Sequence, residues 1–267
     1  MKNLFTFGCS HTNHNYPTWA NILGEQFENH YNFGKGGSGV FYSFYQMISV
    51  IQNKEDWNIT EDDYFVWLVT EENRQDFIMH HKDAEHWDTD SWYNNSRNWW
   101  TENYDKIMSP VDGLSKAYTY IYTIKELLEA NNIKYKIILA LSEDAFLTDV
   151  ANYNEYKRDI NEIIGEYTDL QILGYNAPKD DRHYYFLEDG ELVFDGHFQI
   201  PIHIEFLRRN FDWFEEKNIE KYLKIHDKCK SGRYSPTEIY DQKFYEYPPN
   251  KFKDKRKPII RIVNRMK

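Results

Sequence analysis

The chain has 267 residues and a formal net charge of −11, which is long enough for one large domain and an extension whose core needs no cross-links. Its negative charge argues against general nucleic-acid binding by the main body. Two cysteines, Cys9 and Cys229, give no disulfide framework, and no stretch approaches the roughly 18 apolar residues of a membrane helix. Because Met1 leads into an apolar strand without a signal segment, we expect a soluble, cytoplasmic protein.

Apolar periodicity predicts strands that alternate with helices along most of the chain. Strands are predicted at 2–7, 31–33, 63–69, 136–141 and 170–173. Helices are predicted at 17–27, 40–51, 114–131, 153–167 and 200–214, and a β-hairpin is predicted at 184–194 with its turn at Asp189-Gly190. This alternation implies an α/β fold in which a central parallel sheet carries helices on both faces, giving three α/β/α layers.

Three candidate site residues come directly after the first three predicted strands. They are Ser10, Gly37 and Thr70. Ligands of open parallel sheets bind beyond the carboxyl ends of the strands, so we expect these residues to converge on one edge of the sheet.

A nucleophile, a base and an orienting carboxylate can be assembled from Ser10, His197 and Asp195. A Ser hydroxyl is a poor nucleophile at neutral pH unless a His accepts its proton and a carboxylate orients that His. Asp195 and His197 stand two residues apart, which at the head of a loop lets both point into one cleft. The pattern predicts a serine hydrolase with the chain order Ser, Asp, His.

The order and spacing of these residues resemble the SGNH (GDSL-type) hydrolases. Residues 8–10, Gly-Cys-Ser, correspond to the family's first block with Cys in place of Asp and the nucleophile kept. Residues 32–39 are similar to the second block, with Gly37 on the family's oxyanion-hole glycine, and residues 195–197 resemble a short variant of the last block. The resemblance spans roughly residues 1–213. It implies a flavodoxin-like fold, an esterase or deacylase activity and no cofactor.

The family's third block departs from its pattern in this chain. After the strand the family places Gly-x-Asn-Asp, whereas this chain reads Thr-Glu-Glu-Asn-Arg from Thr70. The family's Asn donor aligns with Glu71, whose carboxylate would repel a developing oxyanion, so Asn73 and Thr70 are the candidate replacements. Losing one oxyanion donor typically costs about 100- to 1000-fold in rate. We therefore expect reduced activity, with complete loss as the open alternative.

Other side chains near these blocks offer alternative chemistry. His203 is the alternative base, although its place inside the predicted closing helix is typical of a surface or capped histidine. Cys9 is an alternative nucleophile, but adjacent side chains diverge in an extended turn, so Cys9 is expected to be a small buried side chain beside Ser10. His11 and His14 flank the nucleophile without a third ligand at coordinating spacing, so no metal is expected there.

A long polar and aromatic insertion at 77–113 lies outside the minimal sheet. It holds four of the eight tryptophans, which suit a platform for sugar rings and ordinary packing equally well. It also holds a cluster of potential metal ligands, for which a solvated loop is the favoured interpretation: His80, His81, Asp83, His86, Asp88 and Asp90.

Residues 214–267 are predicted to be an irregular extension of the domain at 1–213 and not a second domain. Residues 251–267 hold five Lys and three Arg against one Asp, a net charge of +7, so residues 1–250 carry −18. This basic tail is either a disordered solubilising end or a docking segment for an acidic partner, nucleic acid, a neighbouring copy of the chain or its own acidic body.

The sequence therefore predicts a serine esterase or deacylase that acts through an acyl-enzyme on a small-molecule or glycan ester, with O-acetyl carbohydrates as the preferred class. An O-acetyltransferase would use the same acyl-enzyme. The rival class is a catalytically weak or inactive protein of this fold with a structural or assembly role, for instance in a virus particle. The departing third block, the aromatic content of 18% and the basic tail would suit that role.

Overall fold

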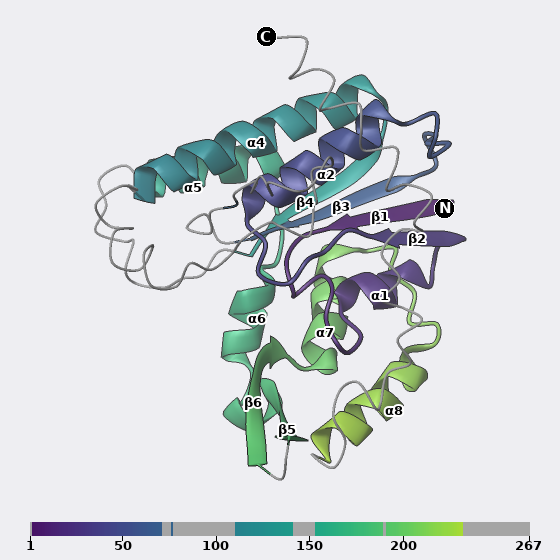
Figure 1. Cartoon of the computed structure of the whole chain (residues 1–267), viewed down its shortest axis with the longest axis vertical. Coiled ribbons are helices and arrows are strands. Elements are labelled where there is room, and N and C mark those ends of the chain that lie inside the picture. Colours follow the sequence, from purple (N-terminus) through teal and green to yellow (C-terminus); the bar gives the residue numbers. More distant parts are fainter. Residues whose placement is uncertain (1, 71–75, 77–109, 141–152, 189–190, 232–267) are drawn as a thin grey trace, which may run out of the picture.

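The computed structural model describes residues 2–70, 76, 110–140, 153–188 and 191–231. Its centre is a sheet of four parallel strands in the order β2-β1-β3-β4 (Figure 1). The strands are β1 (Asn3–Phe7), β2 (Asn29–Asn32), β3 (Tyr64–Val69) and β4 (Lys134–Leu139). The predicted α/β class with a central parallel sheet is confirmed.

The strand order changes direction next to β1. Strand β2 pairs with one edge of β1, and β3 pairs with the other edge. In open α/β sheets such a reversal opens a crevice at the carboxyl ends of the strands. The loops after β1, β2 and β3 leave the sheet at this end, and they carry Ser10, Gly37 and Thr70.

The central strands are buried on both faces. Every residue of β1 and all but the first residue of β3 are buried, which explains their unbroken apolar runs. Alternate side chains of β3 enter two separate cores: Val66 and Leu68 belong to one, and Phe65 and Trp67 belong to the other.

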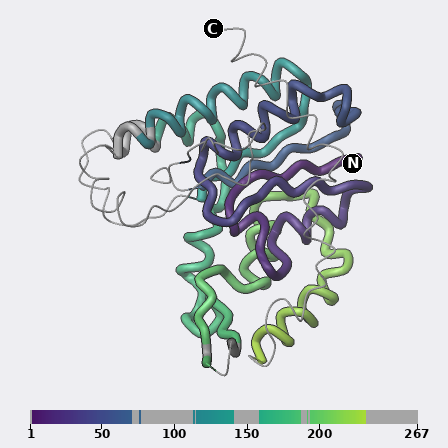
Figure 2. Tube along the Cα trace, in the orientation of Figure 1, coloured from purple at the N-terminus to yellow at the C-terminus, as the bar shows by residue number. Residues whose placement is uncertain are grey.

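Helices cover both faces and complete three layers (Figures 1 and 2). On one side lie α1 (Trp19–Gly24), α7 (Ile200–Asn210) and, further out, α8 (Ile219–Lys230). On the other side lie α2 (Val40–Gln52), α4 (Pro110–Ala130) and α5 (Tyr153–Ile164). Helix α4 begins at Pro110, and proline is favoured in the first turn of a helix. The last four residues of the insertion predicted at 77–113 therefore belong to α4.

The helices in the described part of the chain are too short or too polar to span a bilayer.

The strand predicted at 170–173 is wrong, because this segment belongs to helix α6 (Leu170–Asn176). The Asp169 side chain caps the helix by accepting hydrogen bonds from the backbone N–H groups of Gln171 and Ile172. A short apolar run fits a buried strand and a buried helix equally well, and the cap decides between them here. A short 3-10 turn, η2 (Lys179–Asp181), follows α6.

The predicted hairpin is confirmed as an antiparallel pair outside the main sheet, formed by β5 (His183–Glu188) and β6 (Glu191–Phe198). It is attached to the core by three buried rings, Tyr184, Phe186 and Phe198. Strand β6 continues past Phe194, so Asp195 and His197 lie within a strand and not at the head of a loop. The predicted turn residues lie outside the described ranges.

The segment after the closing helix differs from the predicted irregular extension. Helix α7 ends at Asn210, and α8 follows at Ile219 after Asn218, whose φ is +67°. Ile219, Tyr222 and Cys229 of α8 are buried in the same core as α1 and α7. The predicted extension therefore begins with a helix that packs on the main domain.

Candidate active site

The loop after β1 presents Ser10 in a tight turn. The backbone N–H of Thr12 donates to the Cys9 carbonyl at 2.9 Å, which closes the turn. Gly8 enters it with φ +149°, and a side-chain carbon at this position would lie 2.8 Å from the Leu68 carbonyl oxygen, so only glycine fits. Ser10 is partly exposed at the carboxyl end of β1, where the nucleophile was predicted.

The glycine-rich loop after β2 packs directly against this turn. The Lys35 N–H donates to the Gly8 carbonyl at 3.0 Å, and the Asn13 side chain donates to the Gly34 carbonyl at 3.0 Å. A carbon added to Gly36 would lie 3.9 Å from Ser10 Cβ. The predicted oxyanion glycine, Gly37, follows with φ +74°.

The loop after β3 is described at two positions. Thr70 is only 2% exposed, and its hydroxyl donates to the Ser38 carbonyl at 3.4 Å, which directs it toward the glycine loop. Asp76 accepts from the N–H groups of Gly39 and Tyr42, each at 2.7 Å, at the N-terminus of α2. Sequence reasoning missed Asp76 because no local pattern links it to a helix 34 residues earlier. Glu71 and Asn73, the other two predicted residues of this block, lie outside the described ranges.

Asp195 and His197 form a direct pair on β6. Residues two apart on a strand share a face, and Asp195 Oδ1 accepts from the ring Nδ1 of His197 at 2.7 Å and from its backbone N–H at 2.9 Å. A carboxylate only accepts hydrogen bonds, so the proton of the neutral ring is on Nδ1 and Nε2 is left as an acceptor. This is the ring form that a general base needs.

His14 approaches the same carboxylate from the loop after β1. Its Nε2 lies 2.9 Å from Asp195 Oδ2, and its ring centroid lies 3.7 Å from that of His197. Burial alone would raise the pKa of Asp195, but the hydrogen bonds from His14 and His197 outweigh it and hold that pKa well below its usual range. Burial lowers the pKa of His14, and its bond to Asp195 opposes this in part.

The three side chains also bring together a set of possible metal ligands. One ligand atom each from His14, Asp195 and His197 lies within 4.8 Å of the others. The sequence argument considered only ligands spaced close to His14 along the chain, whereas Asp195 approaches His14 from 181 positions away. Each imidazole already hydrogen-bonds a different oxygen of the carboxylate.

The turn that carries Ser10 approaches this cluster through the neighbouring residue His11. Within the part of the chain that the structure describes, no hydrogen bond joins Ser10 to His197. The ring of the neighbouring His11 lies 5.2 Å from the ring of His197, so the turn and β6 face each other. Catalytic hydrogen bonds are often long in ligand-free enzymes and tighten when substrate binds.

The alternative residues occupy less favourable positions. His203 lies in α7 with no exposed surface, and both its ring nitrogens are buried without a hydrogen-bond partner among the described residues. Burial lowers the pKa of His203 to about 3; the charges of His197 and His14 add to this, and a weak contact with the Phe198 backbone opposes it. Cys9 is 2% exposed, which fits the predicted small buried side chain.

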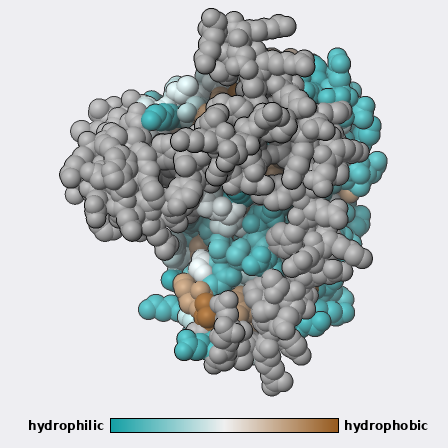
Figure 3. All heavy atoms as spheres, viewed as in Figure 1, coloured by the Kyte–Doolittle hydropathy of each residue, from teal (hydrophilic) through white to brown (hydrophobic). Residues whose placement is uncertain are grey.

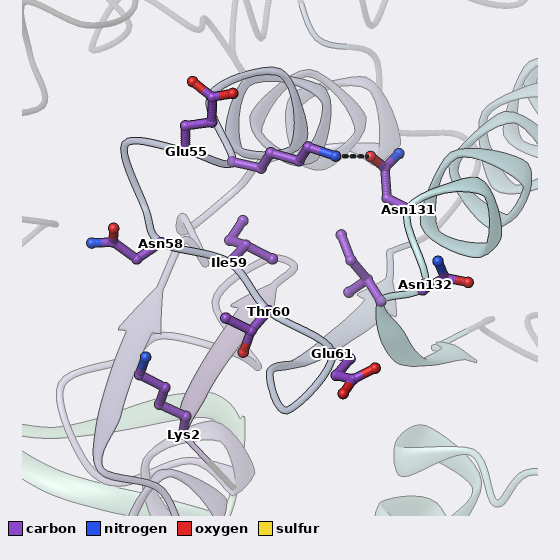
Figure 4. Close-up of a pocket in the computed structure, with 10 residues that line it drawn as sticks. Lys2, Glu55, Asn58, Ile59, Thr60, Glu61, Asn131 and Asn132 are labelled. Carbon is purple, nitrogen blue, oxygen red and sulfur yellow. Dashed lines mark hydrogen bonds between the residues drawn. The ribbon is translucent and has the colours of Figure 1, made fainter.

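A different hollow of about 760 Å³ lies at the opposite edge of the sheet (Figure 4). It is lined by the segments that enter β1, β3 and β4, including Lys2, Thr60 and Asn132. Asn58 and Asn132 have positive φ there. Asparagine is common in turns with this backbone conformation, so the two residues are explained by the turns and not by ligand binding. This hollow contains none of the predicted site residues.

No protein-family model and no curated protein matches the chain. Among solved structures, the chain is similar to protein YxiM from Bacillus subtilis, with 14% sequence identity and a TM-score of 0.35. The alignment covers 64% of this chain and 44% of that protein, so this chain spans less than half the length of the structure it matches. A likeness of this extent leaves the function to be inferred from the site residues.

Proposed function

We infer that the protein is a serine ester hydrolase of SGNH type. Ser10 Oγ attacks the ester carbonyl carbon while His197 Nε2 takes its proton, and the alcohol leaves with that proton as the acyl-enzyme forms. Water then attacks the acyl-enzyme, again with His197 as base, and frees the acid and Ser10. Asp195 holds the imidazole and stabilises its charged form.

The observation that carries this proposal is the Asp195–His197 pair, with 2.7 Å between Oδ1 and Nδ1. That bond fixes the ring form whose Nε2 accepts a proton. The pair faces the turn of Ser10, because the His11 ring packs 5.2 Å from the His197 ring. His203 is the weaker candidate for the base, since it has no exposed surface.

The oxyanion is held by backbone N–H groups in this mechanism. Ser10 and Gly37 supply them, because the turn and the glycine loop are in contact through Lys35 and Gly8. Asn73 adds the third donor, and Thr70 is the less suited replacement because its hydroxyl donates to Ser38. No cofactor takes part.

An O-acetyl carbohydrate remains the preferred substrate class. Two aromatic side chains of the hairpin, Tyr185 and Phe194, are 48% and 54% exposed, and their ring centroids lie 5.6 Å apart. Figure 3 shows apolar surface over β6 beside a strongly hydrophilic area. Exposed ring faces next to the Asp195–His197 strand suit stacking on a sugar. Transfer of the acyl group to a glycan hydroxyl would use the same residues.

Two observations favour the non-enzymatic alternative, a structural or assembly protein. Ser10 makes no hydrogen bond to His197 within the described residues, and Glu71 stands where the family has a donor. A site of this kind could keep its fold without turning over a substrate.

A fluorophosphonate probe separates the two classes, because it phosphonylates only an activated serine. The wild type is expected to be labelled at Ser10, and Ser10→Ala and His197→Ala are each expected to lose labelling and hydrolysis of a short-chain aryl ester. The double variant should be no slower than either single one, since the two residues act as a unit. Ser49→Ala on α2 is the matched control and should label like the wild type.

Failure to label the folded wild type would support the structural role. Labelling that persists in Ser10→Ala would place the reactive group elsewhere. Adding a sugar alcohol during ester turnover distinguishes transfer from hydrolysis, because only a transferase forms the acylated sugar as its main product.

A further inference from the structure

The loop that carries Ser10 is fastened to β6 at two points. His14 Nε2 contacts Asp195 Oδ2 at 2.9 Å, and the Tyr16 hydroxyl donates to the Phe198 carbonyl at 3.2 Å. The His14 ring stands edge-on to Tyr16, with 4.7 Å between their centroids. The His14 and Asp195 side chains are only 15% and 14% exposed, so neither relies mainly on water.

The two oxygens of Asp195 have separate partners. Oδ1 receives both hydrogen bonds from His197, and Oδ2 receives the bond from His14. A largely buried carboxylate oxygen without a partner is costly, so Asp195 would turn or take up water if His14 were absent. Either change would move Oδ1 away from the line to His197 Nδ1.

We propose that His14 is a positioning residue. Its Nε2–H donates a hydrogen bond to Asp195 Oδ2 and thereby keeps Oδ1 aligned on Nδ1 of His197. The nucleophile's own loop thus orients the carboxylate behind the base. This role rests on the proposed ester hydrolysis at Ser10. His14 packs on the His197 ring but takes no part in the proton transfer, and it acts by orienting Asp195.

The same three side chains could instead hold a divalent metal ion as two histidines and a carboxylate. Hydrogen-bond geometry favours positioning. A metal ligand offers a lone pair at its nitrogen, whereas His14 Nε2 and His197 Nδ1 both face acceptor oxygens at 2.9 and 2.7 Å and must carry protons there. The two bonds also end on different oxygens and do not converge on one point.

Steady-state kinetics of three variants test the proposal at a temperature well below each thermal midpoint. His14→Phe keeps a ring over His197 but cannot donate. Removing the hydrogen-bond partner behind a metal-bound histidine typically lowers metal affinity or activity about 10- to 100-fold. By analogy, we expect His14→Phe to lower kcat by a factor of that order and to leave KM unchanged. His14→Gln restores a donor to Asp195 Oδ2 and should return kcat to within about threefold of the wild type.

Tyr16→Phe is the matched control on the same loop. It removes the other tie to β6, the bond to the Phe198 carbonyl. It should lower the thermal midpoint and leave kcat unchanged. Loop anchoring and carboxylate positioning are thereby separated, because anchoring alone would make Tyr16→Phe and His14→Phe behave alike.

Each other result is decisive. Wild-type kcat in His14→Phe, while Ser10→Ala is inactive, overturns the role of His14 and leaves the proposed function intact. Full activity in Ser10→Ala overturns the proposed function and this inference with it. Stoichiometric binding of Zn²⁺ to the wild type by calorimetry, lost in His14→Phe, would make the cluster a metal centre and overturn the positioning role.

Discussion

Two buried titratable groups close to each other, Asp195 and His203, differ in whether they carry a charge. Asp195 is largely buried yet stays charged, because two histidines donate to its oxygens and hold its pKa below the usual range. His203 is fully buried without a hydrogen-bond partner among the described residues, and its pKa falls to about 3. The hydrogen bonds from two histidines outweigh burial at Asp195, whereas burial dominates at His203.

His203 should make the protein less stable in mild acid. The unfolded chain binds a proton at an ordinary histidine pKa of about 6.5, whereas the folded chain binds it only near pH 3. The free energy of unfolding attributable to His203 is therefore fully present above pH 6.5 and falls by up to about 1.4 kcal/mol per pH unit below it. Between pH 7.5 and pH 5 the loss should be about 2 kcal/mol.

Urea unfolding of the wild type and of His203→Leu at both pH values measures this contribution. The variant should lose about 2 kcal/mol less than the wild type on acidification, and it should be at least as stable at pH 7.5 because two unpaired buried nitrogens are removed. An identical pH dependence in both proteins would show that His203 does not titrate in this range.

At the scale of elements, Asp76 caps a helix to which it does not belong. Its two oxygens accept from the N–H groups of Gly39 and Tyr42 at the start of α2. The Gly39 cap residue has no side chain to do this itself. Through this contact Asp76 is tied to the start of α2, which follows the glycine loop beside Ser10.

Asp76→Ala should lower the free energy of unfolding by about 1–2 kcal/mol, because capping oxygens and negative charge at a helix N-terminus are both lost. Asp62→Ala is the matched control, since its side chain is 73% exposed and its ion pair with Lys134 spans 3.9 Å. That control should change stability by less than about 0.5 kcal/mol. Equal effects in denaturant titration would mean that Asp76 acts only through its overall charge.

The elements that could be predicted from sequence are those whose burial leaves a clear periodicity. Strand β3 and helix α2 were predicted almost to the residue, because long apolar or 3.6-residue patterns mark them. The run at 170–173 was too short to distinguish strand from helix. Helix α8 was missed although Ile219, Tyr222 and Cys229 recur at helical spacing, because the many charges between them resemble a solvated segment.

The site divides in the same way. Ser10, Asp195 and His197 could be proposed because each belongs to a short pattern with a chemical reason. His14 and Asp76 could not be placed, since their contacts join residues 181 and 34 positions apart and leave no local pattern. Only the fold brings those loops together.

At the scale of the whole molecule, the C-terminal part contains two segments of different character. Helix α8 joins the core through Ile219, Tyr222 and Cys229, and the Tyr222 hydroxyl donates to the Asn21 carbonyl at 3.2 Å. The His226 ring nitrogen Nδ1 lies 2.9 Å from the Tyr184 hydroxyl of β5. The last seventeen residues carry +7 beside a body of −18.

A truncation series should separate these contributions. Ending the chain after Asn250 should leave the thermal midpoint nearly unchanged and should weaken association with acidic surfaces. Salt should weaken the same association in the full chain, because the Debye length falls from about 10 Å at 0.1 M to about 3 Å at 1 M. Ending it after Ser231 serves as the reference that still keeps α8. Ending it after Phe214 should lower the free energy of unfolding by several kcal/mol relative to that reference. Each large apolar side chain of α8 that is no longer buried contributes about 1.5–3 kcal/mol.

Calorimetry and light scattering at two salt concentrations measure both effects. A large fall in midpoint after Asn250 would show that the tail is part of the folded core.

The residues of the proposed site come from two separate sheets, the central sheet and the hairpin β5–β6. Ser10 stands on the central sheet, whereas His197 and Asp195 stand on a two-stranded ribbon that is marginal by itself and is attached through Tyr184, Phe186 and Phe198. Such peripheral units open at lower free energy than the centre of a domain. Detachment of the ribbon alone would abolish the proposed activity while the sheet remains intact, so activity and global folding can be lost at different temperatures.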